Sequence, residues 1–166
     1  MVQQRPAPQP ERRLPHARRR REHGGVDEFD LERFVEAQDD RGTYQRALAE
    51  VCAGRKDSHW MWFVYPQLAE LGRSPTATHY GISDLDEARA YLAHPVLGPR
   101  LRECTRAAAA IEPGRIRHAF GSIDTMKLRS SMTLFELAGP DEPAFAEVLD
   151  RHFAGERDPA TLDLLR

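Results

Sequence analysis

The chain has 166 residues, of which 40% are hydrophobic and 30% charged, and this length is enough for one domain with a buried core. No apolar run approaches the ~20 residues of a membrane span and no signal peptide is visible, which excludes a membrane protein and predicts a cytoplasmic one. Cys52 and Cys104 lack the spacing of a metal or redox motif, so reduced thiols are expected.

The net charge of −2 is unevenly distributed. Residues 1–26 carry seven arginines and two glutamates, a net charge of +5, which leaves −7 on residues 27–166. The first segment is rich in proline and almost free of apolar side chains, which predicts a disordered basic Arg/Pro-rich tail. Such a tail is either an arm for weak contact with nucleic acid or an acidic partner, or a dispensable extension. Residues 27–166 are expected to form a single helical domain, and its negative charge disfavours nucleic-acid binding.

Helix signals succeed one another from Asp30 to the C-terminus. Asp30 and Thr43 are the expected N-caps of the first two helices, over residues 31–38 and 44–53. Further helices, bounded by capping residues, glycines or prolines, are predicted over residues 85–93, 96–111, 115–120, 122–137 and 142–153 and from 159 onward. No alternating strand pattern of useful length occurs. The predicted fold is all-α, a compact single-domain bundle of about seven to eight helices around a buried Trp-rich helix.

That central helix is expected in the stretch 56–67, the most apolar part of the chain, which holds both tryptophans. On the surface it would expose a large apolar patch, so burial is expected. Ser58 is a suitable N-cap, and Pro66 lacks an amide donor and disfavours the helical conformation at Tyr65. The pattern therefore predicts about two turns of helix, a stop near Tyr65, and a free carbonyl that a side chain or water must satisfy.

Polar residues within this stretch and within residues 122–137 indicate a site. The chain has 22 arginines but two lysines, and Lys56 and Lys127 fall one in each segment. An amine is therefore expected to matter there, either as an anion ligand or in a buried ion-pair strut. On a helix, Asp124, Lys127 and Ser131 would share one face at i, i+3 and i+7. His59 is either a general acid or base or a core residue bonded to a carbonyl.

Four blocks of the sequence resemble a bacterial family known as domain of unknown function 1810. The family's motifs are Lys-x-Ser-His-Trp-Met-Trp-Phe-x-Phe-Pro-Gln, Tyr-x-Ile, Tyr-Leu-x-His-Pro-Val-Leu-Gly-x-Arg-Leu and Gly-x-x-Asp-x-x-Lys-Leu-x-Ser-Ser-Met-Thr-Leu-Phe. They are matched here from Lys56, Tyr80, Tyr91 and Gly121, with Tyr65 in place of a phenylalanine. The resemblance covers about residues 27–165 and implies a small all-helical cytoplasmic protein without an established activity. Members are sometimes labelled calpastatin-like, although a compact helical pattern differs from that of a disordered repeat inhibitor.

The leading functional prediction is a polar-lined pocket that binds or hydrolyses a small anionic ligand, of the nucleotide or nucleotide-sugar type, with N-glycosidic cleavage as the reaction. The catalytic candidates are His59 or Asp124 as base and Lys127 as anion stabiliser. The ligand-binding candidates are Lys56, Ser58, Trp60, Trp62, Gln67, Tyr80, Ser130 and Ser131. The alternative is a non-catalytic protein-interaction module with an exposed tryptophan as anchor. The sequence has no metal-ligand cluster, glycine-rich phosphate loop or nucleophile motif, so no metal or cofactor is expected.

Overall fold

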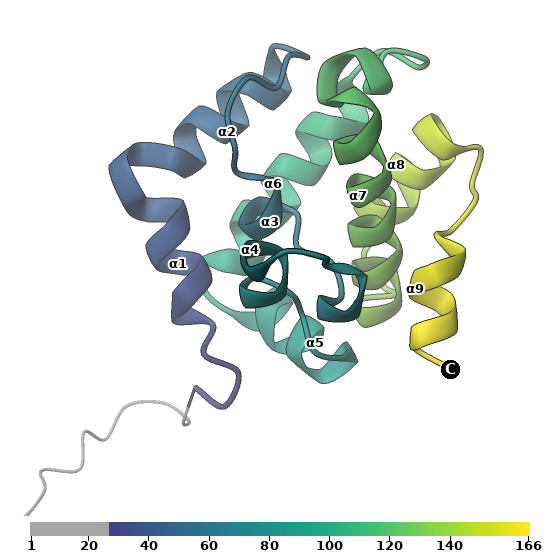
Figure 1. The fold of residues 1–166 in the computed structure, drawn as a ribbon. Helices are drawn as coiled ribbons and strands as arrows, with labels where there is room; N and C mark the ends of the chain where they lie inside the picture. Colours follow the sequence, from purple (N-terminus) through teal and green to yellow (C-terminus); the bar gives the residue numbers. More distant parts are fainter. Residues whose placement is uncertain (1–26) are drawn as a thin grey trace, which may run out of the picture.

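The computed structural model describes residues 27–166, and the predicted basic tail lies outside the described residues. Helices make up the fold over this range, which confirms the all-α prediction, and the part described contains no strand (Figure 1). An isolated parallel bridge joins Leu68 and Ile82. The α-helices are α1 (Glu32–Asp39), α2 (Thr43–Cys52), α3 (Met61–Val64), α4 (Pro75–His79), α5 (Leu85–Ala93), α6 (Leu97–Ala110), α7 (Ile116–Ala138), α8 (Pro143–Phe153) and α9 (Pro159–Leu164), and the 3-10 turns are η1 (Asp40–Gly42) and η2 (Ala69–Leu71).

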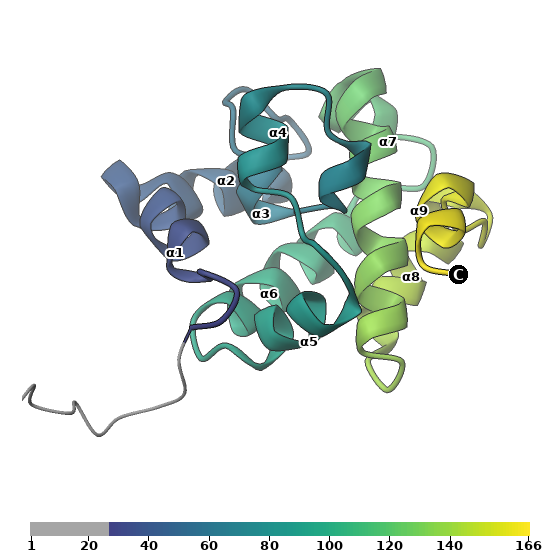
Figure 2. The ribbon, with the colours of Figure 1, turned by 60° about the horizontal axis from the view of Figure 1, so that its bottom comes forward.

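The helices form a bundle in which α6 and α7 are the central members. Helices α1 and α2 lie at one end of the molecule and α8 and α9 at the other, as the views in Figures 1 and 2 agree. Helix α7 packs against α5 and α8, and α6 packs against α2, α5 and α8. The short α3 and α4 lie across this framework, with α3 in contact with α1 and α6. The Trp-rich segment is therefore enclosed by helices that lie far from it in the sequence.

Aromatic side chains fill the core where these helices meet. Trp60, Tyr65, Tyr91, Phe135 and Phe145 are all almost completely buried. The ring centroids of Tyr91 and Phe135 lie 5.3 Å apart, and those of Phe135 and Phe145 lie 5.9 Å apart. The expectation of a buried Trp-rich element holds for Trp60 and its neighbours.

Two helices, α5 and α9, begin directly after the aspartates that the sequence predicted as their N-caps. Asp84 caps α5 by accepting a hydrogen bond from the Glu87 amide at 2.9 Å, and Asp158 caps α9 in the same way through the Thr161 amide at 2.9 Å. The prediction that Asp30 caps α1 was wrong. Asp27 does so instead, since its carboxylate accepts from the amides of Leu31 and Glu32, at 2.9 and 3.2 Å. Asp30 itself has a φ of 51° and contributes its backbone carbonyl to another contact.

Helix α7 is interrupted at Gly121, where the backbone has φ 77° and ψ 167°. A residue with a Cβ is disfavoured at this positive φ, so glycine is suited to the break. The break separates Ile116–Phe120 from a longer helix that begins at Ser122 and runs to Ala138. The sequence predicted this division, with helices over 115–120 and 122–137.

The central stretch forms a shorter helix than expected. Helix α3 has one turn, Met61–Val64, and ends at Tyr65, whose ψ is 70°. The stop before Pro66 is thus where the sequence placed it. The carbonyl of Phe63, left free by this stop, accepts hydrogen bonds from Gln38 Nε2 at 2.8 Å and from the Tyr91 hydroxyl at 3.3 Å. Side chains from α1 and α5 therefore satisfy the carbonyl and fix the segment in the bundle.

Candidate functional site

The segment before α3 is held by a carboxylate that the sequence analysis missed. Glu50, near the end of α2, accepts hydrogen bonds from the amides of Asp57 and Ser58 at 2.9 and 3.1 Å and from Trp60 Nε1 at 2.8 Å. The Ser58 hydroxyl also donates to Glu50. Burial alone would raise the pKa of Glu50, but the bonds from Ser58, Trp60 and Asp57 outweigh it and lower this pKa to about 2. The carboxylate is therefore ionised and fixes the backbone that leads into Trp60.

This arrangement corrects the role predicted for Ser58 as a helix cap. Trp60 occupies the N-cap position of α3, and no side chain caps that helix. Ser58 lies two residues before that position, and its hydroxyl donates to the Glu50 carboxylate instead.

Both lysines meet at Asp124, in the first turn after the Gly121 break. Lys56 Nζ lies 2.9 Å from Asp124 Oδ2, and Lys127 Nζ lies 3.7 Å from Oδ1 of the same carboxylate. The exposed fractions of the three side chains are 8% for Lys56, 22% for Asp124 and 25% for Lys127. Lys56 Nζ also donates to the Ser58 carbonyl at 2.7 Å. We call Lys56, Asp124 and Lys127 the lysine cluster.

Each lysine of the cluster lies over one tryptophan. Lys56 Nζ is 4.9 Å from the centre of the Trp60 ring, and Lys127 Nζ is 5.1 Å from the centre of the Trp62 ring. Trp60 is fully buried, whereas Trp62 is half-buried. Cation–π contacts of this kind fix the position of the lysine head group. The four residues Lys56, Trp62, Asp124 and Lys127 thus come together from two segments that the sequence had singled out.

The predicted serines lie away from solvent on α7. Ser130 is buried and donates to the Met126 carbonyl at 3.2 Å. Ser131 is fully buried, and its hydroxyl has no hydrogen-bond partner among residues 27–166. Neither hydroxyl forms a hydrogen bond with the lysine cluster in this part of the chain, and both side chains lie in the packed interior.

Other predicted residues surround a separate hollow of about 280 Å³, which we call the His59 hollow. His59, Ser58, Trp60 and Tyr80 contribute to its lining, but the three members of the lysine cluster and Trp62 do not. Gln67 is not part of the lining either, and its backbone carbonyl accepts from the Ile82 amide at 2.9 Å. The remaining lining residues are Ala37, Asp40, Thr43, Arg46 and Phe63. The residues predicted for a single pocket therefore fall into two groups, one that lines the His59 hollow and one that forms the lysine cluster.

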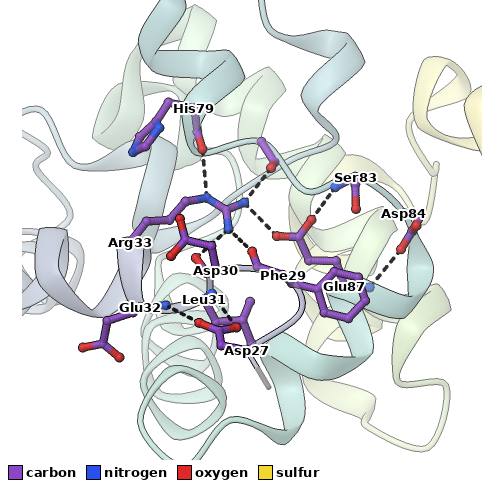
Figure 3. A network of polar contacts seen from close by, with 11 residues as sticks. Asp27, Phe29, Asp30, Leu31, Glu32, Arg33, His79, Ser83, Asp84 and Glu87 are labelled. Carbon is purple, nitrogen blue, oxygen red and sulfur yellow. Dashed lines mark hydrogen bonds and ion pairs between the residues drawn. The ribbon is translucent and has the colours of Figure 1, made fainter. Parts of the chain in front are cut away.

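A second polar network holds the wall of the His59 hollow that carries Tyr80 (Figure 3). Arg33 on α1 donates through Nε to the His79 carbonyl at 2.9 Å and through Nη2 to the Gly81 carbonyl at 3.0 Å. These two carbonyls flank Tyr80, so the guanidinium fixes the backbone on both sides of that residue. Nη2 also forms an ion pair with Glu87 Oε1 at 2.7 Å. No local pattern distinguishes Arg33 from the other 21 arginines of the chain.

The lysine cluster leads to a stability prediction for its two lysines. The ion pair expected between Asp124 and Lys127 is present at 3.7 Å, but Lys56 is the nearer partner of Asp124. Lys127→Met consequently leaves the carboxylate paired and should cost under ~1 kcal/mol. Lys56→Met removes a nearly buried ammonium with one charge-assisted hydrogen bond and one ion pair, and should cost ~1.5–3 kcal/mol. Urea unfolding of the two variants tests this order, and an equal loss in both would contradict it.

Residues 27–166 hold no group of three or more His, Cys, Asp or Glu side chains placed to bind a metal ion. Within the same residues, no helix has both the length and the apolar character needed to cross a membrane.

Comparison with known proteins places these features in a family. Residues 28–165 match the family model described as "Protein of unknown function (DUF1810)". The fold is similar to the crystal structure of the conserved hypothetical protein Rv1873 from Mycobacterium tuberculosis, with a TM-score of 0.81 and 49% sequence identity over 84% of this chain and 98% of that chain. No match was found among curated proteins. Since the family model spans most of the sequence, including both lysine segments, the chain belongs to the DUF1810 family of proteins of unknown function.

Proposed function

We propose that the protein binds a small anionic ligand of the nucleotide or nucleotide-sugar class at the lysine cluster. The observation that carries the proposal is that two ammonium groups share one carboxylate, which leaves a local charge of +1. A cluster that served only to join two elements would need one lysine, and Lys56 at 2.9 Å already supplies it. Lys127 is then in excess, and a phosphate or carboxylate is the natural partner for such a group.

The surroundings of Lys127 suit a ligand with a ring as well as a charge. Its ammonium lies over the half-buried ring of Trp62, so the two side chains present a cation and an aromatic surface together. Asp124 also lines an open hollow of about 450 Å³ with Phe120, Gly121, Ser122 and Ile123. Aromatic rings stack on bases and sugars with little dependence on their identity. The proposal is therefore for a class of ligand rather than for one compound.

The hydrolytic version of the proposal has weaker support than binding. It requires His59 or Asp124 as base and Lys127 as anion stabiliser within reach of one substrate. His59 lines a hollow to which Asp124 and Lys127 do not contribute, and Asp124 is engaged by both lysines. The arrangement thus favours binding at the lysine cluster over N-glycosidic cleavage there.

The alternative of a tryptophan-anchored interaction module has less support as well. Trp60 is fully buried and its Nε1 is bonded to Glu50, so it cannot serve as an exposed anchor. Trp62 is half-buried, with Lys127 over its ring. The large apolar side chains that are exposed near the cluster are instead Ile123 and Met126.

A thermal-shift screen with nucleotides, nucleotide-sugars and inorganic pyrophosphate tests the proposal. We expect at least one of these anions to raise the Tm of the wild-type protein and to lose most of this effect with Lys127→Ala, because the excess ammonium is gone. Arg55→Ala is the matched control, since it removes one positive charge from an exposed residue next to Lys56. Equal shifts in the wild type and in Lys127→Ala, or loss of the shift in Arg55→Ala alone, would count against the lysine cluster.

A further inference from the structure

The His59 hollow has two walls of different chemistry. One wall comes from α1, η1 and the first turns of α2 and carries Asp40, Thr43 and Arg46. The other wall is aromatic, with Trp60, Phe63 and Tyr80. The ring centroids of Phe63 and Tyr80 lie 5.2 Å apart at an interplanar angle of 62°. A planar ligand in the hollow would thus have both aromatic side chains and hydrogen-bonding groups around it.

Several polar side chains that line the hollow have hydrogen-bond donors or acceptors that are free to contact a ligand. Arg46 uses Nη2 for a bond to the Arg41 carbonyl at 3.0 Å, and its Nε and Nη1 make no hydrogen bond with residues 27–166. The His59 ring and the Tyr80 hydroxyl also make none within that range. Asp40 Oδ1 lies 4.0 Å from Arg41 Nε, and both side chains are largely exposed. Three lining groups are exceptions: Trp60 Nε1 and the Ser58 hydroxyl donate to Glu50, and the Thr43 hydroxyl donates to the Asp40 carbonyl at 2.6 Å.

Charge and volume narrow the chemical class of the occupant. Asp40 and Arg46 contribute one charge of each sign, so the hollow favours a neutral ring that both donates and accepts hydrogen bonds over a net ion. A cavity of ~150 Å³ is enough for benzene. The hollow has about 280 Å³, which corresponds to a bicyclic ring rather than a whole nucleotide.

We propose that the His59 hollow is a second site, which binds a neutral bicyclic heterocycle such as a free purine base. The ring lies against Phe63 and Tyr80, and Arg46, His59 and Asp40 supply the donors and acceptors for its edge. This site goes beyond the proposed anion site and does not depend on it, because no member of the lysine cluster lines the hollow. The Arg33 network acts as a positioning element, since it fixes the backbone on both sides of Tyr80.

Isothermal titration of the full chain with adenine and hypoxanthine tests the second site. We expect saturable 1:1 binding with a Kd of about 1 mM or tighter, in line with a ligand of this size. Ala37→Leu adds three carbon atoms at the half-buried lining residue on α1 and should weaken binding at least tenfold by filling the hollow. Its matched control is Ala49→Leu, the same change at an exposed position on α2 that does not line the hollow, which should leave the Kd unchanged.

A second variant and a competitor separate this site from the lysine cluster. His59→Ala alters an exposed side chain, so the protein should remain folded while the affinity for adenine falls several-fold. Lys127→Ala should leave adenine binding intact, and inorganic pyrophosphate should not displace adenine. No binding to the wild type, unchanged binding in both Ala37→Leu and His59→Ala, or loss of adenine binding in Lys127→Ala would each overturn the proposal.

Discussion

Replacement of Arg33 by methionine is expected to lower the free energy of unfolding by ~3–5 kcal/mol, which is the usual loss when one partner of a buried ion pair is removed. The guanidinium has five N–H groups, and all five are bonded. Beyond the carbonyls of His79 and Gly81 and the carboxylate of Glu87, Nη1 donates to the carbonyls of Phe29 and Asp30, at 2.5 and 2.8 Å. The exposed fractions of the two charged side chains are 12% for Arg33 and 4% for Glu87, so water cannot replace the lost bonds readily.

Urea unfolding monitored by circular dichroism measures this loss. Arg89→Met is the matched control, because Arg89 forms an exposed ion pair with Asp86 on α5, at 2.8 Å. This control should change the free energy of unfolding by less than ~1 kcal/mol. Arg33→Lys should recover only part of the stability, since a compact ammonium cannot reach carbonyls on both sides of Tyr80 and the carboxylate of Glu87 at once. Equal losses in Arg33→Met and Arg89→Met would contradict the structural role of Arg33.

Replacement of Glu50 by glutamine should cost ~1–3 kcal/mol and shift tryptophan emission, because a glutamine amide cannot accept all the bonds that the carboxylate accepts. Two backbone amides, the Ser58 hydroxyl and the Trp60 indole donate to Glu50. At least one donor must lose its acceptor, and the indole is the costliest because Trp60 is fully buried. Urea unfolding and emission spectra measure both effects, with Glu147→Gln on α8 as an exposed control that should change neither.

The same carboxylate predicts a pH dependence of stability. The pKa of Glu50 is lowered from its ordinary value of 4.5 to about 2 in the folded protein, because its hydrogen bonds outweigh the effect of burial. The unfolded chain therefore takes up a proton at Glu50 at a higher pH than the folded protein does. The stabilisation is fully present above pH 4.5 and is lost as the pH falls from 4.5 toward 2. Between about pH 6 and about pH 3 the wild type should lose more stability than Glu50→Gln does, and parallel losses would contradict this account.

Local signals sufficed for the position of most helices. The range of α5 agrees with the prediction from Asp84 and the apolar spacing that follows it, and Gly121 divides α7 where the sequence indicated. The stop at Tyr65 was also expected, because proline acts on the residue directly before it. Asp30 was misplaced as a cap because two nearby aspartates offered the same chemistry, and only the path of the backbone selected Asp27.

The candidate site was predicted in its residue types but not in its grouping. The scarcity of lysine drew attention to Lys56 and Lys127, which both pair with Asp124, and the helical spacing correctly brought Asp124 toward Lys127. The closer contact between Asp124 and Lys56 joins residues that lie far apart in the sequence, so no local spacing could reveal it. Ser130 and Ser131 were included on the basis of the same motif, although the packing of α7 directs both into the interior.

The sequence by itself determined the helical class, both ends of α5, the start of α9 and the break at Gly121. These features depend on interactions within a few residues, whose energies the local chain already contains. Tertiary structure alone decided that Arg33 holds the backbone on both sides of Tyr80. It likewise decided that Glu50 holds the backbone that leads into Trp60. It also decided that His59 and Lys127 belong to different sites. A side chain with several donors or acceptors can be satisfied by many partners, and only the packing of distant helices determines which of them lie within reach.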